Sequence, residues 1–114
     1  MITQRAITSR MDDAAFDKVA REELAAIEDA FAEVDPDKVE VSTSDGVLRL
    51  DLKDGTRVVI NSHRAAKQIW MAAVSTAWHF DPTADRGWWA TRSSEELRAT
   101  LKKLVADRAG VQIF

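Results

Sequence analysis

Two Asp-Gly pairs in the middle of the chain, at 45–46 and 54–55, constrain the fold more than any other feature. Apolar and polar residues alternate before, between and after these pairs, over 39–43, 47–52 and 56–60. Asp-Gly favours tight hairpin turns because both turn residues accept positive φ, and strict alternation is typical of a strand with one buried face. The sequence therefore predicts three antiparallel strands joined by two hairpin turns.

Three shorter strands are expected to extend this sheet, over 68–72, 78–80 and 88–91. A polar connection over 61–66 precedes the first of them, and the composition of 81–87 is that of a turn. With these additions the sheet would contain about six strands.

Helical periodicity flanks the strands on both sides. From 12 to 34, apolar residues recur every three or four positions and form one stripe. Ser9, Asp12 or Asp13 can cap the start of this helix. The Asp-Pro pair that follows ends it, because a residue before proline is pushed out of the helical region.

A second helix is expected from Ser93 to about 109. Ser93 and Glu96 have the spacing of a capping box, and Gly110 is the expected C-cap. The apolar residues 111–114 are expected to pack back on the core.

These elements predict an α+β fold, a two-layer α-β sandwich with both helices on one face of the antiparallel sheet. The other face of the sheet would meet solvent. Residues 12–114 are expected to form one domain, and the mixed polar residues 1–11 are interpreted as a loosely ordered leader.

The charge of the chain is unevenly distributed. Residues 12–54 carry 14 acids and five bases, whereas residues 55–114 carry five acids and nine bases. A concentrated anionic surface excludes nucleic acid as its partner and favours a metal cation or a basic protein. The chain has no cysteine, which excludes a thiolate-held iron–sulfur cluster, and no run of the roughly 18 apolar residues that a membrane span needs. A cytoplasmic location fits these features.

Trp70 is an anomaly of the predicted sheet. If Ile69 faces the helices, the alternation places Gln68 and Trp70 on the outer face, beside polar residues. Such a tryptophan is either a binding anchor or a ring packed flat on the stems of neighbouring arginines. The pattern favours neither interpretation.

The two histidines give no sign of catalysis. His79 is expected to face away from Trp78 and Phe80 as a structural residue, and His63 is interpreted as a surface residue that could join a partner contact. No catalytic triad, phosphate loop or zinc motif is visible in the sequence, so we do not expect an enzyme.

Several segments together resemble the frataxin family, in particular its bacterial members. They are the turns at 45–48 and 54–56, the run 59–61, the Lys-Gln-Ile-Trp-Met-Ala-Ala run at 67–73, His79-Phe80, 91–93 with the following helix, and the apolar tail after 109. The resemblance covers about residues 12–114, nearly the whole chain.

This resemblance implies an iron-binding protein of iron–sulfur cluster assembly that is a regulator or an iron donor. It implies weak iron binding on the first helix and the segment after it, at Asp13, Asp17, Glu28, Asp29, Glu33, Asp35 and Asp37. The same acidic surface would dock on a cysteine desulfurase, and the face with Trp70 on the iron–sulfur scaffold protein. The expected protein contacts are Glu40, Asn61, Gln68 and Trp70. A monomer is expected, with iron-dependent oligomers as a further state.

The residue types support iron binding, but their spacing does not indicate a dedicated iron site. Carboxylate oxygens suit ferrous and ferric iron, but the acids of the first helix fall on two flanks without the spacing of a dedicated cage. Asp29 and Glu33 are four apart, where like charges repel. The alternative is an adaptor that binds no metal and whose acids only steer a basic partner.

Two departures from the family pattern bear on these expectations. Ala32 and Lys38 replace acids that relatives often carry, which predicts weaker iron binding than in a richly acidic relative. Thr76-Ala77 stands where relatives have a Gly-Gly turn, and neither residue readily accepts positive φ.

Overall fold

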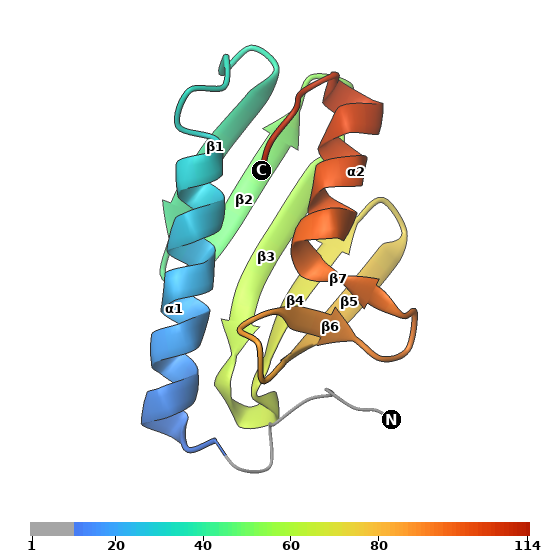
Figure 1. Ribbon diagram of the computed structural model, residues 1–114. Helices are drawn as coiled ribbons and strands as arrows, with labels where there is room; N and C mark the ends of the chain where they lie inside the picture. Colours follow the sequence, from blue (N-terminus) through green and yellow to red (C-terminus); the bar gives the residue numbers. More distant parts are fainter. Residues whose placement is uncertain (1–10) are drawn as a thin grey trace.

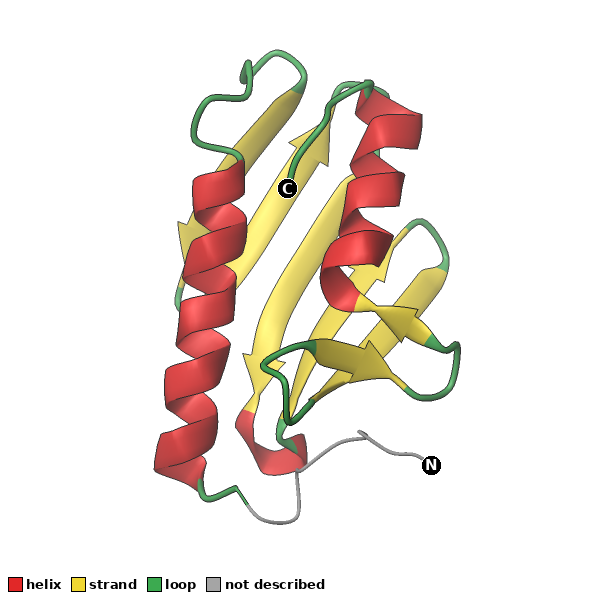
Figure 2. Ribbon diagram, in the orientation of Figure 1, coloured by secondary structure: helices red, strands yellow, loops and turns green. Residues whose placement is uncertain are grey.

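A seven-stranded antiparallel sheet carries two helices on one of its faces, in a computed structural model that describes residues 11–114 (Figures 1 and 2). The strands are paired in chain order, from β1 at one edge to β7 at the other. Their bounds are β1 Val39–Ser44, β2 Val47–Leu52, β3 Arg57–His63, β4 Gln68–Ala73, β5 Thr76–Pro82, β6 Trp88–Ala90 and β7 Glu95–Glu96. The predicted two-layer α-β sandwich is therefore confirmed, and the predicted leader lies outside the described residues except for Met11.

Both Asp-Gly pairs form turns between consecutive strands. Asp45 and Gly46, with φ of 51° and 77°, are the two residues between β1 and β2. This is the two-residue turn in which both residues take positive φ. Gly55, with φ of 93°, turns the chain into β3. The predicted meander is confirmed.

Helix α1 spans Asp13–Ala30 and begins where Asp12 caps it, the Asp12 side chain accepting a hydrogen bond from the Ala15 N–H. Buried Phe16 and Ile27 lie on its inner face. The predicted end at 34 is wrong. The helix ends at Ala30, and the N–H of Phe31 donates to the carbonyls of Glu28 and Asp29. Turns then lead to β1, so Glu33 lies beyond the helix.

Helix α2 spans Leu97–Ala109, and its predicted start at Ser93 is wrong. Residues Glu95 and Glu96 pair instead with β6 as the short strand β7, and Ser94 takes a φ of 57° in the turn between them. Glu96 is itself the N-cap, since its side chain accepts from the Ala99 N–H. Gly110 is the expected C-cap, with φ of 67°.

Two connections also differ from the prediction. Residues 61–63 continue β3, and a short 3-10 helix, η2 (Arg64–Ala66), leads to β4. Thr76 and Ala77 belong to the start of β5, so the turn before them is made by other residues. Val74 takes positive φ there, at 58°, with its side chain 68% exposed. The absence of glycine at 76–77 therefore does not affect this turn.

The core lies between the helices and the inner face of the sheet. Its largest fully buried side chains include Phe16, Phe80, Ile27, Leu48, Leu50, Ile60, Ile69, Met71, Leu97 and Leu101. The C-terminal segment packs on this core through Val111 and Ile113, as expected. Among residues 11–114, neither helix is long and apolar enough to cross a membrane.

An ion pair with a buried carboxylate joins the two helices. Glu23 of α1 is 6% exposed and accepts two hydrogen bonds of 2.9 Å from the guanidinium of Arg98 of α2. The same guanidinium lies 5.1 Å above the ring centre of Phe114. These contacts connect α1, α2 and the C-terminal segment through one side chain.

Candidate functional site

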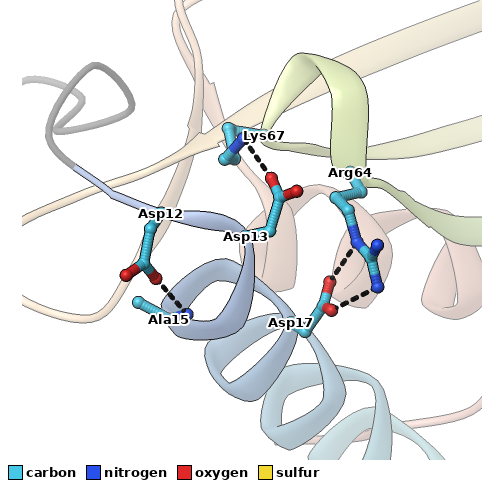
Figure 3. A network of polar contacts seen from close by, with 6 residues as sticks. All are labelled: Asp12, Asp13, Ala15, Asp17, Arg64 and Lys67. Atoms are coloured by element: carbon cyan, nitrogen blue, oxygen red, sulfur yellow. Dashed lines mark hydrogen bonds and ion pairs between the residues drawn. The ribbon is translucent and has the colours of Figure 1, made fainter.

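The acids at the start of α1 are paired with bases of the same chain. Lys67 Nζ lies 2.7 Å from a carboxylate oxygen of Asp13. The guanidinium of Arg64 donates to both carboxylate oxygens of Asp17, at 2.6 and 3.1 Å (Figure 3). Both bases come from η2 and the residue after it, which lie against the first turns of α1. Two of the seven predicted iron ligands therefore already have a cation.

Each of these pairs shifts the pKa of one of its members. The hydrogen bond from Lys67, with its positive charge, holds the pKa of the Asp13 carboxyl below its ordinary value. The hydrogen bond to Asp17 raises the pKa of the Arg64 guanidinium. An incoming cation would have to displace a lysine from Asp13 or an arginine from Asp17.

The acids at the other end of α1 and beyond it have different surroundings. Glu28 Oε2 accepts a weak hydrogen bond, of 3.3 Å, from the Thr43 hydroxyl, and Asp35 accepts one from the Asp37 N–H. Six exposed acids between positions 28 and 40 form no ion pair within residues 11–114. We call these six acids the open acidic segment; they are Glu28, Asp29, Glu33, Asp35, Asp37 and Glu40.

The open acidic segment is not a metal cage. Nowhere in the described part of the chain do three Asp, Glu or His side chains come together so that they could hold one metal ion. The end of α1 at Ala30 explains part of this, because Glu33 no longer follows Asp29 by one helical turn. Any cation here would meet separate, hydrated carboxylates.

A groove of about 350 Å³ lies between α1 and the sheet, beside the open acidic segment. Its lining combines the apolar side chains of Leu24 and Leu48 with carboxylates, hydroxyls and the guanidinium of Arg21. The lining residues are Asp17, Arg21, Leu24, Ala25, Glu28, Thr43, Gly46, Leu48 and Ser62. The lining thus includes one of the paired acids, Asp17, and one acid of the open acidic segment, Glu28.

Trp70 lies on the outer face of the sheet, as the alternation predicts. Its indole ring is stacked between two imidazole rings, with ring centres 3.9 Å from His63 and 4.2 Å from His79. The arginines that we expected as alternative neighbours instead flank Asp51. The ring is therefore packed flat, but on histidines rather than on arginine stems.

The edge of the indole is also held. Trp70 Nε1 donates to the side-chain oxygen of Gln68 at 2.8 Å, and the Gln68 amide donates to Asp81 at 3.0 Å. Asn61 lies opposite Trp70 in the β3–β4 register. Three of the four predicted contact residues thus share one area of the sheet. Glu40 lies away from them on the edge strand β1, opposite Asp51.

The sequence reasoning missed the two histidines as members of this area. His79 faces away from Phe80 as expected, and its ring stacks on one face of the Trp70 indole. The sequence contains the information needed to find them, because the alternation within three consecutive strands places all three rings on the same face of the sheet. A two-residue connection fixes the β4–β5 pairing and brings His79 opposite Trp70.

Comparison with known proteins gives a consistent result. A family model described as a frataxin-like domain matches residues 9–111. The iron–sulfur cluster assembly protein CyaY of Ralstonia pickettii is 33% identical over 107 residues, covering 90% of this chain and 93% of that protein. CyaY of Dechloromonas aromatica is 34% identical over 103 residues, covering 90% and 97% respectively.

Solved structures match the same fold. Frataxin from Psychromonas ingrahamii superposes with a TM-score of 0.82 at 22% identity, covering 90% of this chain and 96% of that one. Trimeric yeast frataxin complexed with ferrous iron has a TM-score of 0.64 at 28% identity, covering 84% and 86%. The chain belongs to the frataxin-like family and resembles its bacterial CyaY proteins.

Proposed function

We propose that this chain binds iron weakly as an iron–sulfur cluster assembly protein, without catalysing a reaction itself. The observation that carries the proposal is the open acidic segment, whose carboxylates take part in no ion pair within residues 11–114. Hard oxygen ligands suit iron. The names of the CyaY relatives and the ferrous complex of yeast frataxin support the same role.

Iron binding is expected to be weak and to be strongest at the open acidic segment. Hydrated, separate carboxylates give a cation long-range attraction but little direct coordination. The predicted ligands Asp13 and Asp17 would contribute less than the others, because Lys67 and Arg64 already neutralise them. Iron is the cargo in this proposal, and the cluster is assembled on another protein.

The same segment is proposed to dock on a basic surface of a cysteine desulfurase in the cytoplasm. Charge complementarity of this kind speeds association and weakens as salt screens it. The area around Trp70 is proposed to face the iron–sulfur scaffold protein. Whether the chain donates iron or restrains the desulfurase is decided by kinetics of cluster assembly with and without it, at several iron levels.

The metal part is tested by adding ferrous iron to labelled protein and recording backbone NMR spectra. Paramagnetic broadening should concentrate between Glu28 and Glu40 and should be weaker at Asp13. The variant Asp29→Asn/Glu33→Gln/Asp37→Asn should lose most of this broadening. Asp107→Asn, which removes one exposed acid from α2, is the matched control and should keep it.

A second candidate function is an adaptor that binds partners and no metal. The lack of three clustered ligands among residues 11–114 favours it. Absence of broadening below millimolar iron, together with intact desulfurase binding, would establish this alternative. If reversing the charges of Glu28, Asp29 and Glu33 left desulfurase affinity unchanged, the open acidic segment would not be the docking surface.

A further inference from the structure

The rings of His63, Trp70 and His79 form a three-layer stack across β3, β4 and β5. The two interplanar angles are 16° and 12°, so both imidazoles lie nearly parallel to the indole. His79 is directly opposite Trp70 in the register, whereas His63 reaches it diagonally, being opposite Gln68. Both faces of the indole are covered, and a partner side chain can stack on Trp70 only if an imidazole moves away.

The two imidazoles differ in their access to water. His79 is exposed, but the Nδ1 atom of His63 is buried and has no hydrogen-bond partner. A neutral ring can leave an unprotonated nitrogen in such a place at moderate cost. A protonated ring carries N–H on both nitrogens, and burying a charged donor without an acceptor is strongly unfavourable.

We propose that proton uptake by His63 uncovers one face of Trp70. The imidazolium would rotate out so that its Nδ1–H reaches water, leaving that side of the indole open to a partner. His79 would remain stacked, because its side chain is already exposed to water and has no buried donor to release. The stack is thus closed when His63 is neutral and open when it is charged.

The charged groups around His63 do not oppose this change. On β5 they are His79 and Asp81, and Asp81 accepts a hydrogen bond from the neutral Gln68 of β4. On the side of η2 they are Arg64 and Lys67, each paired with an acid of α1, which offsets its charge. Opening is therefore expected as the pH falls and the His63 ring takes up a proton.

This inference rests on the proposed function only for its consequence, that an open Trp70 face takes part in docking. The opening itself is tested on the free protein. The indole N–H signal of Trp70, assigned with Trp70→Phe, should move as the pH falls from about 8 to about 5.5. Acrylamide should meanwhile quench Trp70 fluorescence, taken as the difference between the wild type and Trp70→Phe, more strongly at the lower pH.

Two variants separate the roles of the histidines. His63→Ala should show the open level of quenching already at pH 8, with no further rise, and the wild type should reach that level at low pH. His79→Ala should be quenched more at every pH but should keep the rise. A wild type without any rise would overturn the proposal, as would a rise that survives in His63→Ala and disappears in His79→Ala.

Binding to the purified scaffold protein then tests the consequence. Affinity should increase as the pH falls in the wild type and should be constant and high in His63→Ala. An opening stack with unchanged scaffold affinity in both proteins would overturn Trp70 as the docking contact. That failure is distinguishable from the failure of the switch, which the free protein reports by itself.

Discussion

Two carboxylate–guanidinium pairs on α1 have the same chemistry and different surroundings. Glu23 and Arg98 are joined by two hydrogen bonds of 2.9 Å, and Asp17 and Arg64 by two of 2.6 and 3.1 Å. The Glu23 side chain is 6% exposed, whereas that of Asp17 is 32% exposed. The first pair joins α1 to α2, and the second joins α1 to η2.

The difference teaches that geometry alone does not determine what an ion pair contributes. A buried carboxylate that loses its partner is left without water and is strongly destabilising. An exposed carboxylate that loses its partner is hydrated at once. We therefore infer that Glu23–Arg98 holds the fold, whereas Asp17–Arg64 is exchangeable and sets which acids of α1 an external cation can reach.

The largest expected effect is that of Arg98→Met. It leaves Glu23 buried without a partner and should lower the free energy of unfolding by about 3–5 kcal/mol, measured by urea denaturation. The double variant Glu23→Leu/Arg98→Met should recover much of this loss, because no charge is then buried. A loss below about 1 kcal/mol in the single variant would contradict the structural role of this pair.

Trp70→Ala tests the contribution of a half-buried side chain and its two ring contacts to stability. It removes both ring stacks on the outer face but leaves the core intact, so the free energy of unfolding should fall by about 1–2 kcal/mol. Phe80→Ala, which empties a buried position on the adjacent strand, should cost about 3–5 kcal/mol in the same urea experiment. Equal losses in the two variants would mean that Trp70 belongs to the core.

Arg64→Met/Lys67→Met removes the two ion pairs at the start of α1, each of which has one member that is 61% exposed. Stability should change by less than about 1 kcal/mol, because a pair with a solvent-exposed member contributes little. Ferrous iron should then broaden the NMR signals of Asp13 and Asp17 as well as those of the open acidic segment. Lys53→Met, which removes a base outside any ion pair within residues 11–114, is the control and should leave the broadening pattern unchanged.

The smallest expected effect concerns acid stability. The hydrogen bond from Lys67 lowers the folded-state pKa of Asp13 below its ordinary 3.8. The associated stabilisation is therefore present above that value and is lost as the pH falls through the lower folded pKa. Lys67→Met should flatten the fall of stability slightly below about pH 4, measured by thermal unfolding at several pH values. An unchanged slope would show that the pair does not persist in solution.

The sheet could be predicted because its information is local. Alternation and the Asp-Gly pairs give the strands and the first turn directly. The start of α2 could not be predicted in this way, since Glu95 and Glu96 pair with β6 and override the capping-box pattern of Ser93 and Glu96. The end of α1 was also missed, because the stripe of apolar residues continues into the turn that buries Phe31.

The site was predictable only in part, for the same reason. Composition and the resemblance point to the acids of α1, but they do not reveal which acids are already paired. Asp13 and Lys67 are 54 positions apart, and Asp17 and Arg64 are 47 apart. Only the packing of η2 on α1 brings them together. The outer position of Trp70 follows from local alternation, whereas its two histidine neighbours require the register of three strands.

The chain-order pairing of the sheet has a consequence for how the protein folds. Every strand is hydrogen-bonded to the next strand in the sequence, so each pairing closes only a short loop. Proteins dominated by such local contacts cross the folding barrier faster than sandwiches with distant pairings. The sheet can form hairpin by hairpin, and the docking of α1 is the step that brings the most distant segments together, joining Glu23 to Arg98 across 75 positions.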